Sequence, residues 1–129
     1  MPTNGRKQEN MEAPVNLPVL DEQAILERVD GNRDLLREIV ALFLEAYPRQ
    51  QAELGAAIAR GRAEEVARVA HAIKGSVAFF ASGPVVELAR GLEMMGRRGD
   101  LVDAQSRFDA LEAELAQLAG ALRRFATDQ

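Results

Sequence analysis

One histidine and the absence of cysteine limit the reactive side chains of this chain. The sequence has 129 residues, a single histidine, His71, and no cysteine. Without cysteine there is no thiolate nucleophile, no disulfide and no thiolate metal site. One imidazole cannot form a multi-histidine metal cluster. Imidazole chemistry near neutral pH can therefore come only from position 71.

The surroundings of His71 predict a helix with two different faces. The stretch from Arg62 to Phe80 has no proline and one glycine. At roughly 100° per residue, an apolar stripe that should face a core lies opposite His71; it consists of Val66, Val69, Ile73, Val77 and Phe80. The helical neighbours of His71 are small or charged; they are Glu64, Ala67, Arg68, Lys74, Gly75 and Ala78. We expect an exposed imidazole on a bare face that another surface can approach, although an ordinary surface histidine fits this pattern equally well.

The run His71-Ala72-Ile73-Lys74-Gly75-Ser76 resembles the signature of histidine-containing phosphotransfer (HPt) domains. In that family, His-x-hydrophobic-Lys-Gly-small lies on the second long helix of a four-helix bundle. The resemblance extends over about residues 18 to 122 and includes further segments; these are Leu20-Asp21-Glu22, residues 30–36, Phe43-Leu44, residues 58–62, residues 88–93 and Gly99-Asp100.

The chain departs from the family at the end of the histidine helix. The family usually has a glycine ten residues after the histidine, whereas this chain has Ala81 there and its next glycine at Gly83. This affects where the helix ends, and not the imidazole chemistry. We expect Phe79 to flank the docking face or to wedge between helices.

Periodicity and capping residues predict an all-α fold, an up-down-up-down four-helix bundle with a short extra N-terminal helix. Residues 1–17 are predicted to be a flexible tail and residues 18–125 the bundle domain. The short helix should run from Asp21 to Val29. A long helix capped by Asn32 should run from Arg33 to about Arg60 and kink at Pro48. It should bury Leu35, Leu36, Ile39, Val40, Phe43, Leu44 and Tyr47.

The histidine helix should follow the break at Gly61, and two more helices should complete the bundle. Pro84 is predicted to open a helix that runs to about Arg97 and that Gly99 ends. We expect Asp100 to cap the last helix, which should run to about Arg124. The last helix should bury Leu101, Phe108, Leu111, Leu115, Leu118 and Leu122. No segment shows a strand pattern.

Composition excludes several classes of function. The length predicts one domain with a modest core. The net charge of −4 argues against a general nucleic-acid binder. No apolar run is long enough to span a membrane, and the first ten residues lack the apolar centre of a signal peptide. We therefore expect a cytoplasmic monomer that binds neither nucleic acid nor membrane.

Other catalytic patterns are incomplete. Gly91 and Gly96 have the glycine spacing of a phosphate loop, but Arg97-Arg98 follows where Lys-Ser/Thr is required. A di-iron bundle needs Glu-x-x-His motifs, and Arg68 stands three residues before His71. No serine has the sequence context of a triad nucleophile.

The HPt resemblance implies a phosphorelay intermediate. His71 would accept a phosphoryl group from the phosphoaspartate of a receiver domain and pass it to another receiver aspartate. An exposed Lys74 would offset the phosphoryl charge, and Gly75 would let the partner backbone approach. The docking surface would consist of Glu64, Ala67, Arg68 and Ala78.

The resemblance also implies the partners and cofactors. The expected partners are response-regulator receiver domains, a hybrid sensor histidine kinase, or both. The chain itself would need no cofactor, because the receiver supplies Mg²⁺, and it would be a carrier without autokinase activity rather than an enzyme. Two alternatives remain, a degenerate HPt-fold adaptor that binds a partner without being phosphorylated, and an unrelated helical adaptor or dimerisation bundle.

Overall fold

The computed structural model describes residues 19–128, which form five helices and two very short strands. The predicted tail, residues 1–17, lies outside the described residues. The elements in chain order are β1 (Val19–Leu20), α1 (Glu22–Arg28), α2 (Arg33–Ala59), α3 (Ala63–Ala78), β2 (Ala81–Ser82), α4 (Pro84–Arg98) and α5 (Ala104–Thr127).

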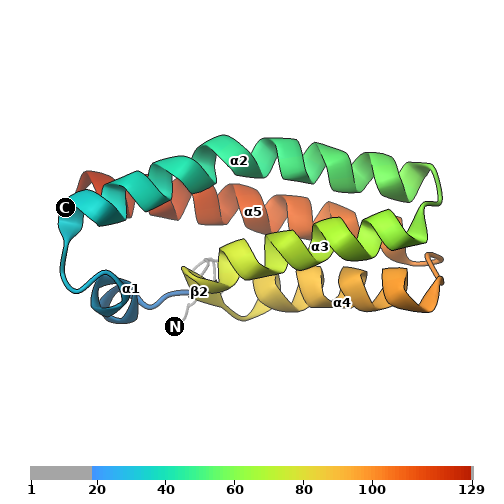
Figure 1. Ribbon diagram of the computed structural model, residues 1–129, viewed down its shortest axis with the longest axis horizontal. Helices are drawn as coiled ribbons and strands as arrows, with labels where there is room; N and C mark the ends of the chain where they lie inside the picture. Colours follow the sequence, from blue (N-terminus) through green and yellow to red (C-terminus); the bar gives the residue numbers. More distant parts are fainter. Residues whose placement is uncertain (1–18, 129) are drawn as a thin grey trace, which may run out of the picture.

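The four long helices form the predicted bundle. Figure 1 shows α2, α3, α4 and α5 side by side with alternating direction, and α1 at one end of the bundle. Each helix turns an apolar stripe inward, as its 3.6-residue period requires. The largest fully buried side chains come from all five helices; they include Ile25, Leu36, Leu54, Val66, Leu92, Leu111, Leu115, Leu118 and Leu122. The all-α bundle is therefore confirmed.

Most of the predicted helix boundaries are also found. Asp21 and Asn32 each accept a hydrogen bond of 3.0 Å from the backbone N–H three residues later, and so cap α1 and α2. Gly99 ends α4 in the left-handed region, at φ 73°. Pro48 lies inside α2, which continues across it.

Three expectations about the elements were wrong. Asp100 does not cap the last helix, because its carboxylate accepts from the N–H of Val102 at 3.2 Å and closes a local turn. The helix α5 begins at Ala104 after Asp103, and Leu101 lies half-buried in the connection. Leu35 is 40% exposed, since neighbouring Leu36 occupies the inward position of that turn.

A fourth difference is a strand pair that the sequence did not predict. Strands β1 and β2 pair antiparallel, with Val19 opposite Ser82 and Leu20 opposite Ala81. Two residues are too few to show the alternation by which strands are recognised. This pair joins the start of the described chain to the link between α3 and α4.

Candidate functional site

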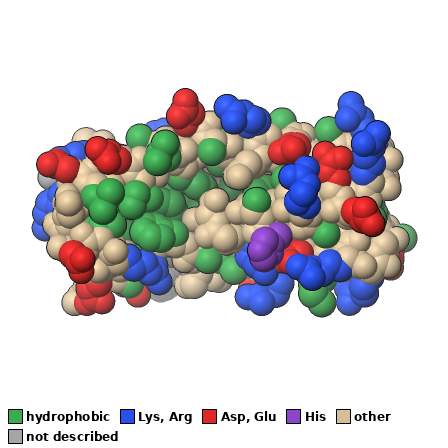
Figure 2. All heavy atoms as spheres, viewed as in Figure 1, with side chains coloured by type: hydrophobic (Ala, Val, Ile, Leu, Met, Phe, Trp, Pro, Cys, Tyr) green, Lys and Arg blue, Asp and Glu red, His purple; other side chains and the backbone are tan. Residues whose placement is uncertain are grey.

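His71 lies on the solvent-facing side of α3. The buried residues of that helix are Val66, Val69, Ala70, Ile73 and Val77. The His71 side chain is 63% exposed, and Figure 2 shows the histidine at the surface among basic side chains. The predicted exposure of His71 is confirmed.

Glu93 on α4 is a buried carboxylate directly beneath the imidazole. It is only 4% exposed. Its Oε2 lies 3.0 Å from Nδ1 of His71 and accepts from Nε and Nη2 of Arg97 at 3.1 and 2.5 Å. Its other oxygen, Oε1, pairs with Nζ of Lys74 at 2.7 Å. The carboxylate thus joins two residues of α3 to one residue of α4.

These contacts keep Glu93 ionised. The Lys74 ammonium is the largest cause of the low pKa of Glu93, about 2, and Arg97 and His71 lower it further, whereas burial acts in the opposite direction. A carboxylate only accepts hydrogen bonds, so a neutral His71 that bonds to it carries its proton on Nδ1. The lone pair of such an imidazole is then on Nε2, the nitrogen that does not face Glu93.

Gly96 determines how closely α4 approaches α3 beside the histidine. A Cβ atom at this position would lie 2.5 Å from the backbone nitrogen of Ala67 and 2.6 Å from the carbonyl oxygen of Ala63. Only glycine permits this approach. Glu93 lies one turn before Gly96, and Arg97 directly follows it. The close contact at Gly96 therefore places both side chains beside His71.

The predicted docking residues divide into two groups. Glu64, Ala67, Arg68 and His71 line a shallow surface hollow of about 430 Å³, together with Gly96 and Arg97. Gly75 and Ala78 are exposed further along α3, outside this hollow. Gly75 has open space around it, since a Cβ atom there would meet nothing within 4 Å.

Two side chains of the predicted site are less exposed than expected. Lys74 was expected to be exposed, but its side chain is only 24% exposed because it reaches the buried Glu93. Ala67 is half-buried, because its backbone packs against Gly96. Arg68 is exposed, and it pairs with Glu53 at 3.4 Å and with Glu65 at 3.8 Å.

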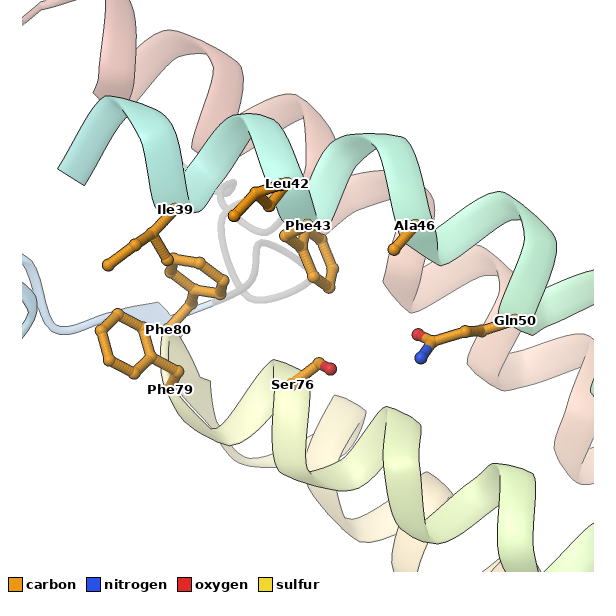
Figure 3. A pocket seen from close by; sticks show the side chains of 8 residues that line it. All are labelled: Ile39, Leu42, Phe43, Ala46, Gln50, Ser76, Phe79 and Phe80. Carbon is orange, nitrogen blue, oxygen red and sulfur yellow. The ribbon is translucent and has the colours of Figure 1, made fainter. Parts of the chain in front are cut away.

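A separate apolar groove of about 280 Å³ lies between α2 and the end of α3 (Figure 3). It is lined by Ile39, Leu42, Phe43, Ala46, Gln50, Ser76, Phe79 and Phe80. Phe79 packs edge-on against Phe80 with ring centres 5.1 Å apart, and Arg28 of α1 donates to the Phe79 carbonyl at 2.5 Å. The half-buried Phe79 side chain thus lies between Phe80 and the Arg28 guanidinium, which is 5.8 Å from its ring centre.

Comparison with known proteins agrees with this geometry. The sequence matches the Hpt domain family over residues 38–121. The chain belongs to the Hpt domain family. This family functions in histidine phosphotransfer in two-component signalling, where its members interact with receiver domains and kinases and carry phosphoryl groups rather than act as enzymes. No curated protein sequence matches the chain.

The fold is similar to a solved structure, histidine-containing phosphotransfer protein B (HptB) from Pseudomonas aeruginosa PAO1. The two share 21% sequence identity with a TM-score of 0.78, over 85% of this chain and 96% of that one. Ala81, which replaces the usual family glycine, is a buried residue of β2. In this link the positive φ, 89°, is at Gly83, and Ala81 has no positive φ, so the backbone at position 81 does not require glycine.

Within residues 19–128, no helix is long and apolar enough to cross a membrane. The same described part of the chain contains no group of three or more His, Asp and Glu side chains that could hold a metal ion.

Sequence reasoning missed Glu93 and Arg97 as site residues. A signal for Glu93 was present, because it is a carboxylate next to the apolar stripe of its helix. The buried residues of α4 are Val85, Ala89, Leu92, Glu93, Met95 and Gly96. A buried acid in such a set requires a basic partner.

Proposed function

We propose that this Hpt domain is a phosphorelay intermediate in which His71 carries the phosphoryl group. The group would come from the phosphoaspartate of one receiver domain and pass to the aspartate of another. The observation that carries the proposal is that a buried, ionised Glu93 holds Nδ1 of His71 at 3.0 Å while the imidazole stays 63% exposed.

The chemistry follows from this tautomer. The lone pair on Nε2 attacks the phosphorus in line, and an N–P bond forms while the P–O bond to the aspartate breaks. The bonding electron pair leaves with the aspartate carboxylate. The proton stays on Nδ1, where Glu93 offsets the positive charge that the ring acquires. The reverse sequence returns the group to a receiver aspartate.

The partner would provide the rest of the reaction centre. A receiver-bound Mg²⁺ would neutralise charge on the phosphoryl oxygens. The exposed face of α3 would let a receiver domain reach His71, because small residues lie beside and beyond the histidine. They are Ala72, Gly75 and Ala78. Small side chains let two protein backbones come close enough for the aspartate and the imidazole to meet.

The test is phosphoryl transfer from a phosphorylated receiver domain. We expect acid-labile, base-stable label on the wild-type protein and none on His71→Gln, while circular dichroism and the melting temperature stay unchanged because His71 is exposed. Label that persists in His71→Gln would contradict the assignment. Tight receiver binding without any label on the wild type would favour the binding-only adaptor.

A further inference from the structure

Within residues 19–128, three basic side chains near His71 differ in how firmly they are held. Lys74 is only 24% exposed and reaches down to Glu93. Arg68 is exposed, but its guanidinium is directed to Glu53 and Glu65. Arg97 is 63% exposed and lines the same hollow as His71.

Lys74 cannot leave Glu93 without leaving a buried charged atom unpaired. Oε1 of Glu93 is fully buried and accepts no hydrogen bond from the described residues, so its ion pair with the Lys74 ammonium at 2.7 Å is what compensates its charge. Removing one partner from a buried ion pair is strongly unfavourable, because the remaining charge is uncompensated. Lys74 is therefore the cation least able to turn toward a phosphoryl group on the surface.

Arg97 can turn without that penalty. It shares Oε2 of Glu93 with Nδ1 of His71, so its guanidinium lies within two hydrogen-bond lengths of the imidazole. If Arg97 moved away, Oε2 would keep His71 and Oε1 would keep Lys74. Arg97 also has further N–H groups that can donate hydrogen bonds, since its contacts to Glu93 use only Nε and Nη2 of a planar guanidinium with five N–H groups.

We propose that Arg97, and not Lys74, is the cation that contacts the phosphoryl group carried by His71. This inference rests on the proposed function of His71. On phosphorylation the guanidinium exchanges its share of Glu93 for the phosphoryl oxygens, which match the planar fork of arginine better than one shared carboxylate oxygen does. Lys74 is a positioning residue that keeps Glu93 ionised beneath the imidazole.

The test compares Arg97→Gln, Arg97→Lys, Lys74→Gln and Arg90→Gln in two measurements. The first is the equilibrium distribution of phosphoryl groups between this chain and a receiver domain, and the second is the melting temperature. A contact made only by phosphohistidine shifts the equilibrium, whereas a contact that only supports the fold shifts the melting temperature.

We expect Arg97→Gln to move the transfer equilibrium toward the receiver by roughly tenfold, with little change in melting temperature. Arg97→Lys should restore part of the shift. Lys74→Gln should lower the melting temperature, and Arg90→Gln should leave both quantities unchanged, since Arg90 is exposed and pairs with Glu87 outside the site. An unchanged equilibrium in Arg97→Gln would overturn the inference, as would a Lys74→Gln shift with unchanged melting. Absence of label on the wild type would instead overturn the proposed function.

Discussion

At the residue scale, Glu93 connects the stability of the fold to the chemistry of His71. Its carboxylate is buried, yet its pKa is lowered to about 2 because Lys74, Arg97 and His71 all contact it. The same contacts select the imidazole tautomer whose free nitrogen does not face Glu93. Loss of Lys74 should therefore lower stability, because it leaves Oε1 unpaired, whereas a change at Arg97, which shares Oε2 with His71, should alter transfer.

Lys74→Met should destabilise the protein. The substitution removes the ammonium that pairs with Oε1 of Glu93 and leaves that buried oxygen without a partner among the described residues, which costs about 1–3 kcal/mol. Urea denaturation should show this loss of unfolding free energy. The matched control is Arg68→Met, whose ion pairs are exposed, and it should change the free energy by less than about 0.5 kcal/mol. Equal effects of the two substitutions would show that Glu93 does not depend on Lys74.

The lowered pKa of Glu93 also predicts how stability depends on pH. A carboxyl whose pKa is lower in the folded state stabilises the fold above its unfolded value of 4.5, and this contribution is lost as the pH falls toward about 2. Glu93→Gln has no charge to titrate there. The difference in unfolding free energy between wild type and Glu93→Gln should therefore change between these two pH values and stay constant above them. A difference that is independent of pH would contradict the ionised state of Glu93.

The sequence predicts the exposure of His71 but not the side chains that support it. The position of His71 on the exposed side of its helix follows from the apolar periodicity of that helix alone. The burial of Lys74 does not follow from this periodicity, since its partner Glu93 lies on another helix, 19 residues further along the chain. A helical wheel describes one helix, whereas an ion pair between helices depends on how both are rotated against each other.

At the scale of elements, the contact between α3 and α4 determines the geometry of the site. Gly96→Ala should separate the two helices locally, because the added Cβ would meet the backbone of Ala67 and Ala63 at under 3 Å and backbone cannot move aside like a flexible side chain. We expect a loss of about 1–3 kcal/mol and slower transfer to His71, as Glu93 and Arg97 move with α4.

The control for this substitution is Gly75→Ala, on the exposed side of α3. A Cβ atom there meets nothing within 4 Å, and alanine favours a helix over glycine by about 1 kcal/mol. Thermal melting should show Gly75→Ala as neutral or more stable and Gly96→Ala as less stable. The opposite ranking would mean that α4 does not approach α3 at Gly96.

Helix boundaries were predictable where the residue at the boundary has a single structural role open to it. Asp21 and Asn32 cap their helices, and Gly99 ends α4 in the left-handed conformation that glycine favours. Asp100 had two available roles, since an aspartate can cap a helix or close a turn two residues ahead. It closes the turn with Val102, and the helix begins three residues after Leu101.

At the scale of the whole molecule, α3 has one face that holds the bundle together and one that is free to meet a partner. Ile73 is buried in the core, whereas Ala78 is exposed on the side of His71 and Gly75. Ile73→Ala should cost about 2–5 kcal/mol of unfolding free energy, because it removes buried methylene groups and leaves a cavity. Well below its melting temperature, the folded variant should still transfer phosphoryl groups at close to the wild-type rate.

Ala78→Arg should have the reverse effects. An arginine at an exposed helical position changes stability by less than about 0.5 kcal/mol, but its long side chain would keep a docked receiver away from the imidazole and slow the transfer. Thermal melting and transfer rate, measured on both variants, separate the two faces of the helix. If Ala78→Arg unfolds the protein while Ile73→Ala is silent in melting, α3 is rotated from the position described. If Ala78→Arg leaves both melting and transfer unchanged, the partner docks elsewhere on the bundle.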